Sequence, residues 1–311
     1  MDTPQHDTLF PAEWPALPDA PGFTHSIVET PGLRTHLAEI GEGDPVLLLH
    51  GCPEHWWQWE TVAPLVAARG YRVLCPDLRG AGWTAAADEH MDRETRLQDI
   101  LAILDELGIA RAHLLSHDLG ALTAMQLSYE HPERVRRAVQ LSVPPAFMAF
   151  SLRTLPGFKH LPAFLFHRPG ASLRGTFSSE YAARPLPDAV IDAHLAPLRR
   201  PEIDRAIRSA SRRLIVPEGL RMTAGVYRRR RLTVPTRFVY GREDRFWNEA
   251  IMRRICRHPE RYADRVDFAY VDGASHFMTD DAPGAVADVA LEWIEQDAGA
   301  PTGGPEAIRW G

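Results

Sequence analysis

The chain of 311 residues predicts an α/β fold, a mostly parallel sheet flanked by helices with an inserted helical lid. Three observations lead to this prediction. Short apolar runs alternate with segments of helical spacing over residues 22–143, the alternation stops over residues 144–231, and it resumes over residues 232–297. Strands that alternate with helices usually pair in parallel, so the two alternating parts are expected to form one core and the interruption to form the lid.

The first expected elements are an arm and a hairpin. Residues 1–21 are rich in proline and predict an extended arm, to which no chemistry is assigned. Residues 24–29 and 33–40 have the composition of strands, and the Pro31-Gly32 turn between them indicates a hairpin.

The core elements follow from hydrophobic patterning. Short apolar or β-branched runs predict strands at residues 46–49, 72–75, 113–115, 135–141, 236–240 and 265–271. Apolar residues at three- and four-residue spacing predict helices at residues 61–69, 94–107 and 283–296. Residues 298–311 lack any periodicity and are expected to form a flexible tail.

Composition and charge argue against several classes of protein. Hydrophobic residues make up 45% of the chain and charged residues 24%, as in ordinary globular proteins, and the net charge of −6 disfavours general binding to nucleic acid. The basic run at residues 228–231 is interpreted as a solvated face. Three widely spaced cysteines fit a reducing compartment, and the sequence shows no secretory signal and no membrane-spanning stretch. We therefore expect a cytoplasmic protein that binds neither nucleic acid nor membrane, and a homodimer is one assembly that the sequence allows.

Asp118 occupies the position of a nucleophile at a sharp strand-to-helix turn. Such a turn needs small residues two before and two after the nucleophile, and Ser116 and Gly120 stand there. A carboxylate that attacks a saturated carbon displaces a halide or opens an epoxide and leaves an alkyl ester on the enzyme. The alternative is that Asp118 only caps the helix that follows.

Two later residues complete a nucleophile, acid and histidine in that chain order. Asp244 follows the strand at residues 236–240, and His276 follows the strand at residues 265–271. Open parallel sheets bind their ligands at these strand ends. Taken alone, Asp244 could be a turn residue and His276 a surface histidine, but their joint order and placement favour a catalytic triad.

The segment His50-Gly51-Cys52-Pro53 predicts an oxyanion hole. Gly51 allows a sharp bend after an early strand, Pro53 makes the bend rigid, and His50 belongs to the same supporting loop. The backbone N–H groups of Cys52 and Leu119 are expected to stabilise a developing oxyanion. An ordinary tight turn is the alternative interpretation.

Together these motifs resemble the epoxide hydrolase branch of the α/β-hydrolase superfamily, over about residues 22–296. The segments that carry the resemblance are residues 50–59, 76–83 and 116–120 and the loops of Asp244 and His276. The resemblance implies that Asp118 opens an epoxide, that His276 activates water against the resulting ester, and that Asp244 orients His276. It also implies a small apolar organic substrate, with no cofactor and no metal.

Two features depart from the pattern of that family. Leu119 stands where the family usually has a tryptophan, which the sister haloalkane dehalogenases use to bind the halide. Pro162 and Ser211 stand near the expected positions of two lid tyrosines that protonate the epoxide oxygen. Tyr181 and Tyr227 are the phenols available in or beside the lid, and Tyr227 is expected to be structural.

Trp56 and Trp57 are, with Tyr181, the candidate substrate-binding residues. Both tryptophans lie just beyond the predicted oxyanion loop, although packing in the core is the alternative for any aromatic cluster. The histidines outside the triad, such as His167 and His194, do not have the spacing of metal ligands, and no glycine-rich cofactor loop is present.

The sequence thus supports an epoxide hydrolase as the first hypothesis. Dehalogenation is an alternative that the absent tyrosines favour and Leu119 disfavours. A hydrolase-fold protein that binds a ligand without turnover is an alternative of another class, because a fold does not fix a function.

Overall fold

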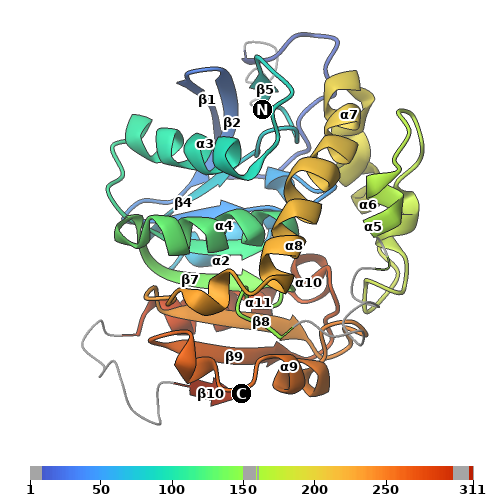
Figure 1. Cartoon of the computed structure of the whole chain (residues 1–311). Helices are drawn as coiled ribbons and strands as arrows, with labels where there is room; N and C mark the ends of the chain where they lie inside the picture. The colour runs from blue at the N-terminus through green and yellow to red at the C-terminus, as the bar shows by residue number, and fades with distance from the viewer. Residues whose placement is uncertain (1–8, 150–158, 160, 297–307, 311) are drawn as a thin grey trace.

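The computed structural model describes residues 9–149, 159, 161–296 and 308–310 (Figure 1). Its strands form one sheet in the order β1-β2-β4-β3-β6-β7-β8-β9-β10, with β5 paired to β2. The strands are β1 (Thr24–Thr30), β2 (Leu33–Ile40), β3 (Asp44–Leu49), β4 (Tyr71–Pro76), β5 (Ala85–Ala86), β6 (Ala112–His117), β7 (Val135–Leu141), β8 (Thr236–Gly241), β9 (Val266–Val271) and β10 (Ile308–Trp310).

The sheet is mostly parallel, as the sequence predicts. The β1–β2 hairpin is antiparallel, and β2 runs antiparallel to β4. From β4 across to β10 every neighbouring pair is parallel. Strands from before and after the lid are therefore neighbours in one sheet, and the pairing of β7 with β8 joins them.

Helices cover both faces of this sheet (Figure 1). The core helices are α2 (Val62–Ala67), α3 (Arg93–Glu106), α4 (Asp118–Glu130), α9 (Glu249–Ile255), α10 (Met278–Asp281) and α11 (Pro283–Ile294). The helices between β7 and β8, in the segment predicted to be the lid and called the lid below, are α5 (Leu161–Leu165), α6 (Asp188–Leu195), α7 (Pro201–Ala210) and α8 (Val216–Thr223). Short tight helical turns are η1 (Trp56–Trp59), η2 (Pro132–Arg134), η4 (Arg174–Phe177), η5 (Ala196–Arg199), η7 (Tyr227–Arg229) and η8 (Pro259–Arg261), whereas η6 (Ser211–Ile215) is a wider π-helical turn.

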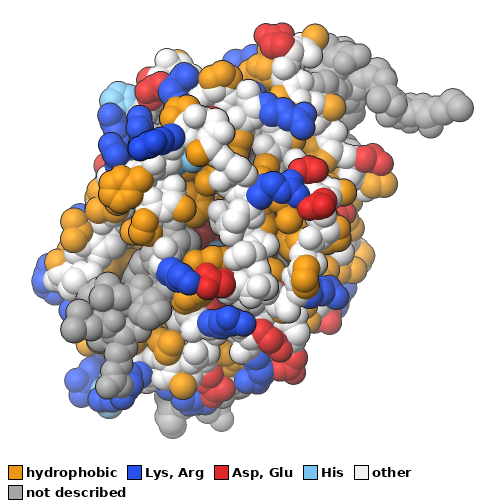
Figure 2. All heavy atoms as spheres, turned by 90° about the vertical axis from the view of Figure 1, so that its right-hand side faces the viewer, with side chains coloured by type: hydrophobic (Ala, Val, Ile, Leu, Met, Phe, Trp, Pro, Cys, Tyr) orange, Lys and Arg blue, Asp and Glu red, His pale blue; other side chains and the backbone are white. Residues whose placement is uncertain are grey.

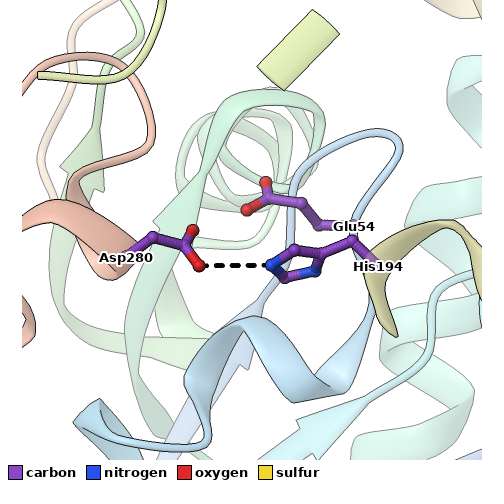
Figure 3. A group of neighbouring side chains, drawn as sticks. All are labelled: Glu54, His194 and Asp280. Atoms are coloured by element: carbon purple, nitrogen blue, oxygen red, sulfur yellow. Dashed lines mark hydrogen bonds and ion pairs between the residues drawn. The ribbon is translucent and has the colours of Figure 1, made fainter. Parts of the chain in front are cut away.

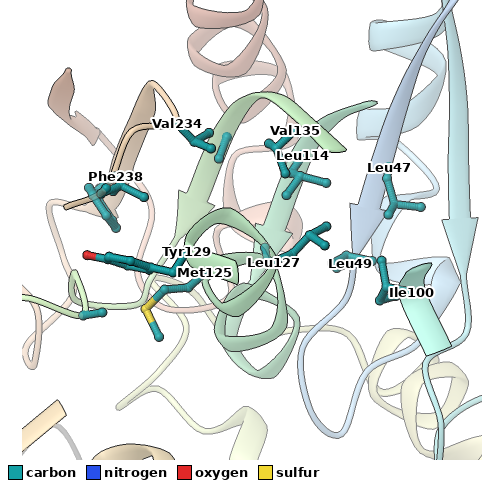
Figure 4. Close-up of a cluster of buried hydrophobic side chains, with 14 of the residues drawn as sticks. Leu47, Leu49, Ile100, Leu114, Met125, Leu127, Tyr129, Val135, Val234 and Phe238 are labelled. Atoms are coloured by element: carbon teal, nitrogen blue, oxygen red, sulfur yellow. The ribbon is translucent and has the colours of Figure 1, made fainter. Parts of the chain in front are cut away.

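Side chains of the central strands point alternately to the two faces of the sheet and pack into two separate hydrophobic cores. In β3, Leu47 and Leu49 belong to the cluster under α3 and α4, whereas Val46 and Leu48 belong to the cluster under α2 and α11. Figure 4 shows the first cluster, in which Leu47 and Leu49 lie beside Ile100. Successive residues of a strand point to opposite faces, so these apolar runs need helices on both sides.

Described residues near both ends of the chain contact the core. Within the predicted arm, Phe10 is buried and stacks on Trp14, and Trp83 Nε1–H donates to Pro15 O at 2.7 Å; residues 1–8 lie outside the described part. Residues 308–310 of the predicted flexible tail form β10 beside β9, which corrects that expectation for these three residues. The rest of the tail lies outside the described residues. No described helix is both long and apolar enough to cross a membrane.

Candidate active site

Asp118 lies at the turn between β6 and α4, with a positive φ of 45° that is unfavourable for a residue with a side chain. A Cβ atom at Gly120 would lie 2.2 Å from Leu49 O, so only glycine allows the start of α4 to come this close to the end of β3. The Ser116 hydroxyl donates to Val139 O at 3.2 Å. These contacts are the local requirements that the sequence motif predicts, and they present the Asp118 carboxylate at the carboxyl edge of the sheet.

The loop after β3 places a backbone donor on this carboxylate. Cys52 N–H donates to Asp118 Oδ1 at 3.2 Å. His50 fixes the loop through both ring nitrogens, because Nδ1 lies 2.7 Å from Gly51 O and Nε2 accepts from Leu78 N–H at 2.9 Å. Burial lowers the pKa of His50 to about 4, so its ring is neutral, as this arrangement requires. The Cys52-Pro53 peptide bond is cis.

The Cys52 side chain is not expected to react. Burial raises the pKa of the Cys52 thiol, and the nearby Asp118 charge raises it further. The thiolate is the nucleophilic form of cysteine, so a thiol that stays protonated is inert. The contribution of Cys52 to the site is its backbone N–H.

His276 faces the Asp118 carboxylate. Its Nε2 lies 3.7 Å from Asp118 Oδ2, and the two side chains are 12% and 22% exposed because both border a cavity. This places one Asp118 oxygen near the imidazole and the other on the Cys52 N–H. The arrangement suits a nucleophilic carboxylate with an adjacent base.

Asp244 is buried in the loop after β8. Its Oδ1 accepts from Phe246 N–H at 2.7 Å and from Trp247 N–H at 3.0 Å. Burial raises the pKa of Asp244, and these two N–H groups oppose the rise. Its Oδ2 has no hydrogen-bond partner among the described residues, so the role of Asp244 in orienting His276 stays a prediction.

A buried pair that the sequence analysis did not identify, His117 and Glu54, adjoins the nucleophile. His117 Nδ1 lies 2.9 Å from Glu54 Oε2, and His117 Nε2 lies 3.0 Å from the carbonyl oxygen of His276. Since a carbonyl only accepts, Nε2 carries a hydrogen, and Nδ1 shares the second hydrogen with the carboxylate. Burial, the largest single effect, lowers the pKa of His117, but the charge and hydrogen bond of Glu54, the Asp118 charge and the bond to the His276 carbonyl together raise it above its ordinary value. The signal available in the sequence was a histidine directly before the nucleophile and a glutamate in the His50 loop.

An apolar cavity of about 330 Å³ lies in front of Asp118 and His276. The lid contributes Leu161 and Phe164 from α5 and Val216 and Leu220 from the region of α8 to its wall. Leu220 lines the cavity and is also 64% exposed, so it lies at the mouth. Figure 2 faces the lid side, where hydrophobic and basic side chains are interspersed. The lining suits a small apolar ligand.

The lid places one phenol at this cavity. Tyr181 lines the cavity, and its ring lies edge-on to His276 with 6.3 Å between the centroids. Tyr227 is buried elsewhere, and its hydroxyl bonds to the Glu218 carboxylate, in agreement with the structural role expected for it. Neither Pro162 nor Ser211 is among the described residues that line the cavity.

Trp56 and Trp57 do not line the cavity, which corrects their prediction as substrate-binding residues. Trp56 is fully buried and packs edge-on against Phe23 and His25 of the hairpin region. Trp57 Nε1–H donates to Asp19 O at 3.2 Å. Both tryptophans therefore belong to the packing of the core, the alternative that the sequence left open.

Glu54, His194 and Asp280 come together although they are far apart in the sequence (Figure 3). One nitrogen or oxygen from each lies within 4.8 Å of the other two, close enough to consider a metal ion. With His117 included, however, two carboxylates face two imidazoles, and the charges balance when both imidazoles are protonated. Burial, the largest single effect, lowers the pKa of His194, but the charge and hydrogen bond of Asp280 and the charges of Glu54 and Glu60 together raise it. Burial raises the pKa of Glu54 as well, so this cluster favours the binding of protons.

Comparisons with known proteins show the family to which the chain belongs. The alpha/beta hydrolase fold family model matches residues 44–283. Bifunctional epoxide hydrolase 2 of Sus scrofa is 25% identical over 92% of this chain, which spans only 59% of that protein's length. Epoxide hydrolase A of Mycobacterium tuberculosis is 28% identical, with 87% of this chain and 97% of that protein covered. The crystal structure of an epoxide hydrolase from Vigna radiata matches with a TM-score of 0.71 at 25% identity, covering 89% of this chain and 99% of the other.

Proposed function

Because the chain belongs to the alpha/beta hydrolase fold family and is related to epoxide hydrolases, we propose that it opens a small or medium apolar epoxide to a diol through an ester on Asp118. The observation that carries the proposal is the Asp118 carboxylate at a strained turn, with Cys52 N–H on one oxygen and His276 Nε2 beside the other. The apolar cavity in front of these groups supports an apolar substrate.

In the first step, an Asp118 oxygen attacks one epoxide carbon. A carbon–oxygen bond forms, the ring carbon–oxygen bond breaks, and the released oxygen needs a proton, because an alkoxide is a poor leaving group. Tyr181 is the proposed donor, since it is the tyrosine among the described residues lining the cavity. Burial raises the pKa of its phenol, which keeps the proton in place until the ring opens.

In the second step, water hydrolyses the ester. His276 takes a proton from water, the resulting hydroxide attacks the ester carbonyl carbon of Asp118, and the oxyanion is stabilised by the N–H groups of Cys52 and Leu119. Collapse of this intermediate breaks the ester bond, the leaving alkoxide takes the proton held by His276 and departs as the diol, and the proton of the Asp118 carboxyl group returns to the Tyr181 phenolate, which restores the carboxylate. In this scheme the buried Asp244 stabilises the imidazolium that forms on His276.

Trapping the ester tests the proposal. The His276→Gln variant should accept styrene oxide or a 1,2-epoxyalkane and keep it, so that peptide mass spectrometry finds the mass of the epoxide added at Asp118. In the double variant with Asp118→Asn this added mass should disappear. Label on a serine, or no label and no turnover with the whole panel, would contradict the proposal, and the second result would favour a ligand-binding protein.

Dehalogenation is tested in the same assay. A 1-bromoalkane gives the same kind of ester but releases bromide and needs no proton donor. Leu119 supplies no side-chain N–H for a halide, so bromide release is expected to be slower than diol formation. The Tyr181→Phe variant separates the two reactions, because it should slow epoxide opening by about 10²-fold or more and leave bromide release unchanged.

A further inference from the structure

One segment of the lid is bonded to the loop that carries His276. Phe277 N–H donates to Tyr181 O at 3.1 Å. The Asp281 carboxylate accepts from Ala183 N–H in the lid at 2.9 Å and from Ser275 N–H in the loop at 2.9 Å, so it ties the two together. This part of the lid, residues 181–194, therefore adjoins the base of the active site as well as the substrate cavity.

His194, at the end of this segment, also contacts the loop that carries His276 and is buried between that loop and the lid. Its Nε2 lies 3.3 Å from Asp280 Oδ1, on the short helix α10 that follows His276 (Figure 3). The ring is stacked on Phe177 of the lid and lies edge-on to Trp57 of the core, each with centroids 5.4 Å apart. These contacts from both sides fix the direction in which the imidazole points.

A chain of contacts through Glu54 and His117 also connects the His194 imidazole to the backbone of His276. The Glu54 carboxylate lies beside the gap between His194 and Asp280 (Figure 3), and its Oε2 contacts His117. His117 in turn contacts the His276 carbonyl oxygen, which also accepts from Ser142 Oγ–H at 3.0 Å. Without His194, the buried Glu54 carboxylate and the half-buried Asp280 carboxylate would share only the His117 charge, and repulsion between them would favour separation of α10 from the Glu54 loop.

We propose that His194 is a positioning residue for His276 and acts from the lid. By bonding Asp280 and balancing the Glu54 and Asp280 charges, it holds the loop at residues 275–281 and so sets the imidazole relative to the ester on Asp118. The kinetic part rests on the proposed function, because the ester must exist for its hydrolysis to be affected. In that reaction His276 acts only in the second step, so loss of His194 slows ester hydrolysis and spares ester formation.

The test compares His194→Leu, His194→Gln and the exposed control His90→Leu in the full chain. Single-turnover reactions with styrene oxide, quenched and read by mass spectrometry, give the rates of both steps. In His194→Leu the ester should accumulate, with hydrolysis slowed between about tenfold and a hundredfold, as for a misplaced base, and formation essentially unchanged. Glutamine keeps an N–H donor for Asp280 and should recover part of the rate. Unchanged hydrolysis, or equal slowing of both steps, would overturn the proposal.

Hydrogen exchange keeps the inference testable without turnover. Amides of residues 275–281 should exchange faster in His194→Leu than in the parent protein and in His90→Leu, because the lid contact no longer holds the loop. Unchanged protection there would contradict the positioning role even if the protein were active. Absence of any ester in the parent and in His276→Gln, with increased exchange in His194→Leu, would instead count against the proposed function alone.

Discussion

Gly51 shows how tightly the residues around the nucleophile are packed. A Cβ atom there would lie 2.5 Å from Glu54 Oε2 and 2.7 Å from His117 Nδ1, and 3.0 Å from the Cβ of Asp118. The backbone of Gly51 does not have a positive φ, so the requirement for glycine comes from these side chains. An added methyl group would have to move a buried ion pair.

The Gly51→Ala substitution is therefore expected to reduce both stability and activity. Overpacking of a buried site costs about 1–3 kcal/mol, and the shift of His117 would move the carbonyl of His276 and lower turnover by about tenfold or more. Urea unfolding and steady-state kinetics measure the two effects. Gly175→Ala is the matched control, because a Cβ there meets no atom within 4 Å. Equal behaviour of the two variants would show that the loop can relax around the methyl group.

The residues that sequence analysis placed correctly are those whose requirements are local. The sharp turn at Asp118 needs small neighbours, and Gly120 lies against Leu49 O, as the motif predicts. Trp56 and Trp57 were misplaced because the direction of a side chain in a loop depends on what packs beside it. Here the neighbour of Trp56 is Phe23, which lies more than thirty positions away in the chain, and no local pattern encodes that contact.

At the scale of elements, Arg200 connects the lid to the core between η5 and α7. Its Nη1–H donates to Gly82 O at 2.8 Å and its Nη2–H to Thr84 O at 3.2 Å. The guanidinium also lies 3.3 Å from the centroid of the Trp14 ring. One buried cation thus joins the lid, a core loop and the N-terminal segment.

Replacing Arg200 with alanine should loosen the lid. The variant leaves two backbone carbonyls without this donor and removes the cation–π contact, so we expect a loss of about 2–4 kcal/mol in the free energy of unfolding. Limited proteolysis should cut the lid region of Arg200→Ala faster than that of the parent. The neighbouring Arg199 is exposed, and Arg199→Ala should match the parent in both measurements. Equal proteolysis of both variants would mean that other contacts hold the lid.

Patterning predicted the core elements better than the lid. The helix expected at residues 94–107 is α3 (Arg93–Glu106), because its buried face repeats at three and four residues. In the lid, prolines and arginines interrupt the hydrophobic periodicity, so the sequence did not show where each helix begins. It indicated only that the segment is mostly helical. The cluster of Glu54, His194 and Asp280 joins a loop, a lid helix and α10, so its spacing along the chain carried no signal.

For the whole molecule, the parallel sheet explains why distant residues meet. The loops after β3, β6, β8 and β9 all leave the same edge of one sheet, which brings Cys52, Asp118, Asp244 and His276 to one end. This convergence follows from strand direction alone and was predictable. The short strand β10 was not, because three residues with no repeating pattern gain their strand conformation only from pairing with β9.

The whole molecule should lose stability on mild acidification, because it holds four neutral histidines, of which His50, His55 and His113 are buried and His25 is half-buried. Burial lowers the pKa of His25, His50 and His113 to about 4 and that of His55 to about 3. In the unfolded chain these groups titrate near pH 6.5, so between pH 4 and 6.5 the unfolded state binds more protons than the folded state. Stability therefore falls as the pH falls through this window.

Urea unfolding between pH 7 and pH 5 measures this effect. From these histidines alone, proton uptake on unfolding should approach about three to four near pH 5, where His117 and His194, with their raised pKa values, are protonated in both states. His113→Gln should reduce the uptake by about one proton. Stability that rises or stays constant on acidification would show that water reaches these rings in the folded protein.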